Sequence, residues 1–255
     1  MTDERLSHRR PGVEASVRTA AIWATVAEHA SRRQAELDRP LTVLDLGGGS
    51  GGLAVPLALE GHEVLVVDPS PDALASLRRR AAETDASHLI TARQGDADSL
   101  KALLDGRAVD LVTCHGTLEH VDDPESTVAR LAEVLAPGGL LSLVTTQRLA
   151  AVLSRALAGA FDKARTALSS PDGRWGADDP VPHRFDSDEV LALVRAAGLA
   201  VVDTHPVRIF TDLAPSAALD SEADRHALLA LEEAAAAHPA LTSLASALHV
   251  VAARP

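Results

Sequence analysis

The sequence is poor in the features that mark secreted and membrane proteins. It contains a single cysteine, Cys114, so no internal disulfide can form, and a reducing cytosol is the environment expected for such a chain. No uninterrupted apolar run reaches about 18 residues, the length that suggests a membrane-spanning helix. The N-terminal segment 1–11 is polar, and no apolar run of the kind found in secretory signals follows it. We therefore expect a cytoplasmic protein with no membrane partner.

Positive charge and metal-binding patterns are also scarce. The formal net charge is −12, which argues against a protein that binds nucleic acid mainly through phosphates, although a local basic patch stays possible. There is no CxxC or HxxxH spacing, and His183 and His205 each stand alone. His115 and His120 lie five residues apart across a predicted strand–helix boundary, which is a poor arrangement for chelation. No metal is expected.

Short apolar runs alternate with amphipathic stretches, which predicts a doubly wound, Rossmann-like α/β fold. Such alternation is typical of a mostly parallel sheet with helices on both faces. We expect one domain, 1–255, made of an N-terminal cap helix (13–36), a cofactor-binding core (42–145), a lid insertion (146–187) and a second insertion (207–246). The predicted strands are Thr42–Leu46, Glu63–Val67, Leu89–Arg93, Val109–Cys114, Leu140–Thr145, Ala200–His205 and Leu248–Ala253.

The most informative segment is a glycine-rich turn that follows the first predicted strand. Glycine permits positive φ and has no Cβ, so a ligand can approach the backbone closely at the carboxyl edge of the sheet. The glycines also match the dinucleotide pattern G-x-G-x-x-G, and an ordinary tight turn is a further alternative. A carboxylate just before the turn, Asp45, favours a ligand with a cationic head group over a pyrophosphate. The predicted ligand-binding glycines are Gly47, Gly48, Gly49 and Gly51.

Two further acids follow the second and third predicted strands. Asp68 can accept hydrogen bonds from both hydroxyls of a ribose, a feature that NAD sites share. Its alternative role is a helix N-cap, because Pro69 and a Ser-Pro-Asp sequence come next. Asp96, followed by Ala97, can accept a hydrogen bond from the exocyclic amine of an adenine. Together the three acids predict a nucleoside pocket across the ends of three strands.

These motifs, in this order, resemble the class I S-adenosylmethionine-dependent methyltransferases. The similarity rests on the Asp45–Gly51 turn, Asp68, Gly95-Asp96, the segment 110–120 and the Leu-Ala-Pro-Gly-Gly segment 135–139. It covers 42–145 and continues more weakly to the C-terminus. The resemblance implies S-adenosyl-L-methionine as cofactor and a seven-stranded sheet whose last strand is antiparallel.

The flanking segments 16–23, 207–213 and 248–255 look like those of the bacterial tRNA 5-carboxymethoxyuridine methyltransferases. By that resemblance, Arg18 would contact the methionine carboxylate of the cofactor and His115 would lie beside it, with segment 157–162 covering the site. Arg18 could instead be a surface charge, and His115 an ordinary histidine at a strand end. The chain departs from that group by having no tyrosine and by an acidic insertion at 172–179, which puts the substrate in doubt.

The acceptor is therefore predicted only as a small molecule or a modified nucleoside, in tRNA as one alternative. A carboxylate acceptor needs no base, whereas a hydroxyl or an amine would need one, and His115 and His120 are the candidates. For Glu119 and His120 the alternative is helix capping and solvent exposure. The candidate substrate contacts are Phe161, Arg165, Arg208 and Phe210, and residues 148–165 form a candidate cationic surface. NAD-linked oxidoreduction and a non-catalytic cofactor-binding module are the competing functions, and the oligomeric state is not predicted.

Overall fold

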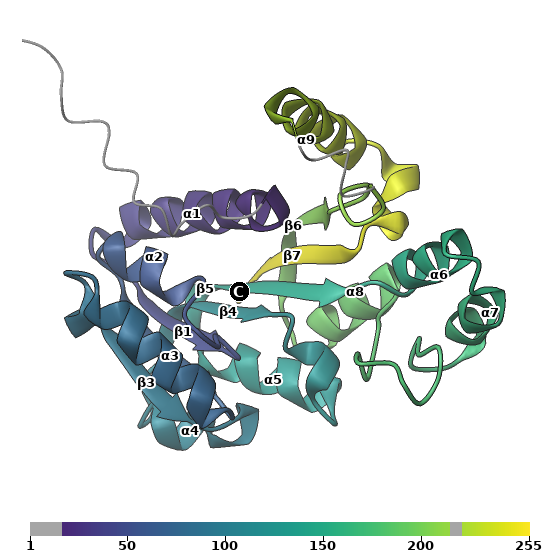
Figure 1. Cartoon of the computed structure of the whole chain (residues 1–255). Coiled ribbons are helices and arrows are strands. Elements are labelled where there is room, and N and C mark those ends of the chain that lie inside the picture. Colours follow the sequence, from purple (N-terminus) through teal and green to yellow (C-terminus); the bar gives the residue numbers. More distant parts are fainter. Residues whose placement is uncertain (1–16, 215–220) are drawn as a thin grey trace, which may run out of the picture.

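In the computed structural model, residues 17–214 and 221–255 are described, and side chains from residue 21 onward. They contain a seven-stranded sheet in the order β3-β2-β1-β4-β5-β7-β6 (Figure 1). β1 to β5 are parallel to one another, and β7 lies between β5 and β6 and is antiparallel to both. The strands are β1 (Thr42–Leu46), β2 (Glu63–Asp68), β3 (Ile90–Gln94), β4 (Val109–His115), β5 (Leu135–Thr146), β6 (Ala200–Val207) and β7 (Ala247–Ala253). The predicted doubly wound fold, with its antiparallel last strand, is confirmed.

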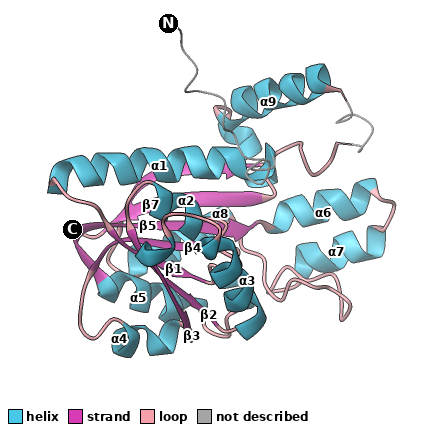
Figure 2. Cartoon of the chain, turned by 60° about the vertical axis from the view of Figure 1, so that its left-hand side comes forward, coloured by secondary structure: helices cyan, strands magenta, loops and turns pink. Residues whose placement is uncertain are grey.

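Helices cover both faces of the sheet, as Figure 2 shows for α1 on one side and α4 and α5 on the other. One hydrophobic cluster packs α1, α2 and α3 against β1, β2 and β4, and another packs α4, α5 and α8 against the opposite face. The α-helices are α1 (Val17–Leu37), α2 (Ala54–Leu59), α3 (Pro71–Ala82), α4 (Leu100–Leu103), α5 (Pro124–Val134), α6 (Arg148–Leu157), α7 (Phe161–Ser169), α8 (Ser187–Ala196) and α9 (Glu222–Ala236).

The boundary between α5 and β5 differs most from the sequence prediction. β5 begins at Leu135 rather than Leu140, because Leu135 already pairs with Val109 of β4. The ladder then shifts register before it resumes at Leu111 and Leu140. The glycine pair after this point breaks the apolar pattern, so the first residues of the strand are not recognisable as one in the sequence.

The N-terminal helix α1 runs from the carboxyl edge of the sheet back to its amino edge. Ile22 packs against Val144 near the end of β5, whereas Arg33 donates from Nη2 to the carbonyl of Pro137 near the start of β5, at 2.9 Å. The first turn of α1 therefore lies toward the strand ends that carry the predicted site. Of the predicted cap helix, residues 13–16 lie outside the described part.

The segment after β5 forms a helical pair and a pinned loop. α6 and α7 extend beyond the ends of the central strands (Figure 1). In the following loop, Arg184 makes a bidentate, buried ion pair with Asp179 at 2.7 and 3.0 Å. The guanidinium of Arg184 also lies 4.2 Å from the ring centroid of Trp175, and that of Arg155 lies 4.4 Å from it. The acidic insertion thus binds arginines of its own chain.

Within the described part, no helix is both long enough and apolar enough to cross a membrane.

Candidate functional site

The glycine-rich turn leaves β1 and passes close to the ends of β2 and β4. The amide of Gly47 donates to the carbonyl of Val67 at 2.7 Å. Gly47, Gly49 and Gly51 have φ values of 70°, 55° and 82°, which only glycine adopts readily. A Cβ on Gly47 would lie 2.0 Å from Oγ1 of Thr117, so the turn is packed against the loop after β4. This explains why the turn must be glycine-rich before any ligand is considered.

Asp45 lies beneath this turn with one carboxylate oxygen satisfied and one not. The hydroxyl of Thr113 on β4 donates to Oδ1 at 2.6 Å, whereas Oδ2 is buried without a hydrogen-bond partner among the described residues. Burial, opposed by the Thr113 hydrogen bond and assisted by the charge of Asp68, raises the pKa of Asp45 to about 6. A Cβ on Gly48 would lie 2.2 Å from Oδ2. A cation or an N–H donor that reached Oδ2 would satisfy it and lower that pKa.

Asp68 joins the glycine turn to the start of α3. Its Oδ2 accepts from the amide of Gly49 at 2.9 Å, and its Oδ1 accepts from the amide of Ser70 at 2.8 Å. The N-cap of α3 is Ser70, whose hydroxyl accepts from the amide of Ala73, so the alternative role of Asp68 as the N-cap is wrong. Each oxygen keeps acceptor capacity for a further donor, such as a sugar hydroxyl.

The segments after β2 and β3 meet at the same edge. The amide of Gly95 donates to the carbonyl of Asp68 at 3.3 Å, and Gln94 donates from Nε2 to the carbonyl of Pro69. Asp96 is exposed and caps the 3-10 helix η2 (Ala97–Ser99), where its Oδ1 accepts from two backbone amides. Ala97 is buried in the core. The predicted pocket residues Asp45, Asp68 and Asp96 thus follow one another along the carboxyl ends of β1, β2 and β3.

His115 ends β4, beside β1 in the sheet. Thr113 pairs with Asp45 in register, and His115 lies two residues further on, so the side chains of all three share one face. Nε2 of His115 lies 2.8 Å from the hydroxyl of Ser142 on β5. Burial lowers the pKa of His115 to about 3, so the ring is neutral at physiological pH. The side chain of Arg18, in the first turn of α1, lies outside the described side chains.

Glu119 and His120, in the 3-10 helix η3 (Leu118–His120), differ from one another. His120 is exposed, whereas Glu119 is 2% exposed and accepts at Oε1 from the amide of Thr146 at 2.5 Å. Its Oε2 has no partner among the described residues, and neither have the buried hydroxyls of Thr145 and Thr146. The expectation of solvent exposure is therefore wrong for Glu119. The burial of Glu119 is not apparent from the sequence, because its hydrogen-bond partner lies on β5.

The sequence suggested that His183 and His205 stand alone, but each has a carboxylate neighbour in the structure. His205 lies 2.9 Å from a carboxylate oxygen of Asp203 and its ring centroid is 6.1 Å from that of His249. His183 lies 3.3 Å from Glu189 and its ring is 4.2 Å from that of Phe185. The described residues contain no group of three or more side chains placed to hold a metal ion.

The four predicted substrate contacts are not gathered in one place by any contact that the structure shows. Phe161 is 72% exposed at the start of α7, and Arg165 pairs with Asp162 on the same helix at 3.2 Å. Phe210 packs against a small cluster after β6 that includes Ile209 and Ala235. Arg208 lies 3.3 Å from Asp212. Their role in substrate binding stays a prediction.

The predicted cationic surface at 148–165 is largely neutralised by the chain itself. Arg148 donates to the carbonyls of Ser170 and Pro171 and lies 3.3 Å from Asp186, and Lys163 lies 2.6 Å from Asp178. Arg155 lies over the ring of Trp175, and Arg165 has its helix partner. The sequence showed only one acid within this segment, because the others come from the loop and from α8.

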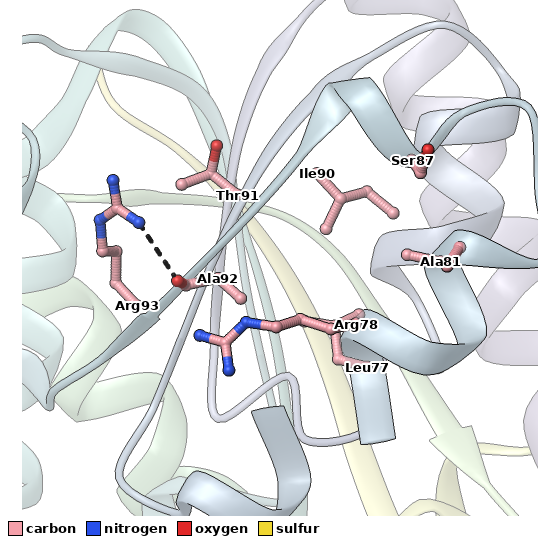
Figure 3. Close-up of a pocket in the computed structure, with 9 residues that line it drawn as sticks. Leu77, Arg78, Ala81, Ser87, Ile90, Thr91, Ala92 and Arg93 are labelled. Atoms are coloured by element: carbon pink, nitrogen blue, oxygen red, sulfur yellow. Dashed lines mark hydrogen bonds between the residues drawn. The ribbon is translucent and has the colours of Figure 1, made fainter. Parts of the chain in front are cut away.

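A cavity of about 340 Å³ lies away from these residues, between α3 and the edge strand β3 (Figure 3). Arg78 and Arg93 lie at its rim, and Leu77 and Ile90 contribute apolar wall. None of the predicted cofactor residues lines it. The candidate site is therefore the open edge at the glycine turn rather than this cavity.

Comparisons with known proteins identify the family to which this chain is similar. The family model described as "Methyltransferase domain" matches residues 20–204. The tRNA 5-carboxymethoxyuridine methyltransferase of Escherichia coli O157:H7 is 28% identical over 240 residues, which cover 94% of this chain and 88% of the relative. The ubiquinone biosynthesis O-methyltransferase of Xanthomonas euvesicatoria pv. vesicatoria (strain 85-10) is 33% identical over 161 residues, 63% of each chain.

Solved structures show the same fold. The magnesium protoporphyrin IX methyltransferase of Synechocystis PCC 6803 with bound SAH superposes with a TM-score of 0.60 at 18% identity, over 94% of this chain and 86% of that one. The [4+2]-cyclase SpnF superposes with a TM-score of 0.59 at 19% identity, over 92% and 80%. The family match sets aside the NAD-dependent alternative. This chain belongs to the methyltransferase domain family and is an S-adenosylmethionine-dependent methyltransferase of class I.

Proposed function

We propose that this enzyme methylates an oxygen or nitrogen of a small molecule or of a modified nucleoside, at the carboxyl edge of β1 and β4. The observation that carries the proposal is the shared sheet face of Asp45, Thr113 and His115. An unsatisfied carboxylate oxygen and a neutral imidazole therefore lie on the same face of two adjacent central strands, near their carboxyl ends, which supports the proposal. The acceptor would approach from the side of α6 and α7, which follow β5 at this edge.

The residues of the edge fit S-adenosylmethionine. The unpartnered Oδ2 of Asp45 suits the ammonium group of its methionine part, and the two backbone-anchored oxygens of Asp68 suit the ribose hydroxyls. The backbone of Gly49 is open, since a Cβ built there would meet nothing closer than 3.9 Å. Asp96 keeps Oδ2 outside its capping bonds and could accept from the adenine amine.

The cofactor supplies an activated methyl group, so the protein has to position and desolvate rather than activate. Methyl transfer forms a bond from the acceptor lone pair to the methyl carbon and breaks the carbon–sulfur bond, whose electron pair stays on sulfur. The reacting atoms must be held about 3–3.5 Å apart and in line. Asp45 would hold the amino group, Asp68 the sugar, and His115 would border the acceptor.

A second candidate acceptor is the carboxylate of a carboxymethoxy group on a tRNA wobble uridine. The relative that methylates tRNA matches nearly the whole length of this chain, which favours it. The net charge of −12 and the internally paired cations of 148–165 weigh against extensive phosphate contacts. A small acceptor needs none of those contacts.

Transfer of a radioactive methyl group identifies the acceptor class. The purified protein would be incubated with tritium-labelled S-adenosylmethionine and a cell extract, which is then separated into RNA, protein and small molecules. Label in the small-molecule fraction supports the leading proposal, and label in tRNA supports the second. Absence of label from every fraction, with the cofactor bound, would favour a non-catalytic module. The Asp68→Ala variant provides the matched control.

A further inference from the structure

A row of histidines crosses one face of the sheet from the site to its far edge. His115 on β4 pairs in register with Val144 on β5, Val144 pairs with His249 on β7, and His249 pairs with His205 on β6. Side chains directly opposite one another share a face, so the three imidazoles lie on one side of the sheet. Ser142 lies two residues before Val144, on that same face.

The hydroxyl of Ser142 bridges two of these rings. It lies 2.8 Å from Nε2 of His115 and 2.8 Å from Nε2 of His249, and the ring centroids of the two histidines are 5.5 Å apart. A hydroxyl carries one proton, so it donates to one of the rings and accepts from the other. The direction of these two hydrogen bonds decides which nitrogen of each ring carries the proton.

The buried ring of His249 determines the direction of both hydrogen bonds. His249 is 0% exposed, and its Nδ1 has no hydrogen-bond partner among the described residues. A proton on this Nδ1 would leave an N–H donor buried and unpaired, which native proteins avoid. The proton of His249 therefore belongs on Nε2, which donates to Ser142. Ser142 in turn donates to Nε2 of His115.

Neither a charge on His249 nor a nearby carboxylate changes the direction of these hydrogen bonds. Burial and, to a smaller extent, the neighbouring His115, His205 and His29 lower the pKa of His249 to about 2, so the ring is neutral. The carboxylate of Asp203 on β6 lies 2.9 Å from His205 and 3.7 Å from His29 of α1. It is thus engaged by the two outer histidines and not by His249.

We propose that Ser142 and His249 are positioning residues that fix the imidazole of His115 as its Nδ1–H tautomer, so that His115 presents a hydrogen-bond donor to the bound groups. Nδ1 of His115 has no partner within the described chain, and the residue is partly exposed, so this nitrogen is the one that faces the site. His115 then cannot remove a proton through Nδ1. It would instead donate to an oxygen of the acceptor or of the cofactor, and the acceptor must carry its own lone pair or use another base. This inference rests on the proposed function only for the statement that bound groups lie beside His115.

The tautomer is measured directly by NMR of the imidazole nitrogens. The wild-type protein, labelled with ¹⁵N-histidine, would be recorded at neutral pH, and the signals of His115 identified by their loss in His115→Gln. The proposal expects a protonated Nδ1 and an unprotonated Nε2 in His115, and the reverse in His249. A proton on Nε2 of His115, or a charged ring at neutral pH, would overturn it.

Three variants separate positioning from general packing. Ser142→Ala removes the bridge, and we expect His115 to change to a mixture of tautomers with a population on Nε2–H. His249→Gln keeps an N–H donor toward Ser142 and should keep the Nδ1–H tautomer. His205→Gln makes the same change one position along the row, outside the bridge, and should leave the His115 signals unchanged. An unaltered His115 tautomer in Ser142→Ala would contradict the proposal.

Binding of S-adenosylhomocysteine distinguishes the failure of this inference from the failure of the proposed site. The titration is followed by calorimetry and, in parallel, by the imidazole signals. Binding that leaves the signals of His115 unmoved would remove His115 from the site, whereas the tautomer assignment would still be tested by the apo spectrum. Binding that shifts Nδ1 of His115 and leaves its tautomer unchanged is the expected result.

Discussion

At the scale of single residues, Asp68 holds the strongest position in the candidate site. It anchors two backbone amides, those of Gly49 and Ser70, and is 7% exposed. We expect Asp68→Ala to weaken binding of S-adenosylhomocysteine by about 1–3 kcal/mol, or roughly 5- to 150-fold, because the ribose hydroxyls of the ligand would be buried without their acceptor. Isothermal titration calorimetry measures this, with Asp72→Ala, in the first turn of α3, as the control. An unchanged dissociation constant would remove Asp68 from the ribose pocket.

The glycines of the turn differ sharply in what they tolerate. A Cβ on Gly48 would lie 2.2 Å from Oδ2 of Asp45 and 2.9 Å from a methyl group of Val66, whereas one on Gly52 would meet nothing within 4 Å. We expect Gly48→Ala to lose at least about tenfold in affinity for S-adenosylhomocysteine, equivalent to about 1.4 kcal/mol, and Gly52→Ala to bind normally. Calorimetry, with thermal unfolding to check the fold, tests the pair. Equal affinities of the two variants would show that the turn accommodates the added methyl group at position 48 without loss of binding free energy.

Residues close in sequence to a strand end were predictable, and those that reach the site from other strands were not. Asp45, Asp68 and Asp96 each lie at or just after the end of a predicted strand, and parallel strands bring their carboxyl ends to one edge. Ser142 and His249 lie 107 residues apart and meet only because β7 inserts beside β5. No local pattern in the sequence indicates that pairing.

At the scale of elements, the loop between α7 and α8 depends on one ion pair. Arg184 and Asp179 have side chains that are 6% and 0% exposed, and the carboxylate also accepts from the amides of Trp175 and Val181. Arg184→Gln would leave the buried carboxylate without its cation, and we expect a loss of about 3–5 kcal/mol in the free energy of unfolding. Urea denaturation measures it.

Lys163→Gln is the matched control for that change. It breaks the ion pair between Lys163 and Asp178. Their side chains are 43% and 69% exposed, and water solvates both groups when they separate. Exposed pairs contribute little, so we expect no measurable loss of stability. If Arg184→Gln proved as harmless as Lys163→Gln, the loop would be held by its aromatic and backbone contacts instead.

The same loop is held by contacts that its composition does not indicate. Its serines, prolines, glycines and aspartates are typical of an unstructured connection, yet Arg148 and Arg184 bind its carbonyls and carboxylates from both ends. Of the cations that suggested a phosphate-binding surface, Lys163 pairs with Asp178 of the acidic insertion, Arg148 with Asp186 and Arg165 with Asp162. That pairing depends on how α6, α7 and the loop fold back, which the linear order of charges does not show.

At the scale of the whole molecule, the apolar pattern specifies the layers, and the polar residues between the layers set its response to pH. The buried rings of His115 and His249 have pKa values near 3 and 2, far below the ordinary value of 6.5. The folded-state pKa is lowered, so the unfolded chain binds protons first as the pH falls below about 6.5. Their contribution to stability is complete above that pH and is lost progressively below it. Asp45 acts in the opposite sense, since its raised pKa of about 6 stabilises the folded state as acid protonates it.

A difference measurement isolates the histidines from this background. Urea unfolding of the wild type and of His249→Gln would be followed at pH 7.5 and pH 5, because the glutamine does not titrate and the carboxylates are common to both proteins. At pH 5 the wild type has an extra loss of about 2 kcal/mol from His249, since each pH unit below 6.5 costs about 1.36 kcal/mol per histidine that stays neutral when folded. The difference in the free energy of unfolding between the wild type and His249→Gln should therefore become smaller, or change sign, between pH 7.5 and pH 5. A constant difference for His249→Gln would mean that the ring of His249 accepts a proton within the folded protein.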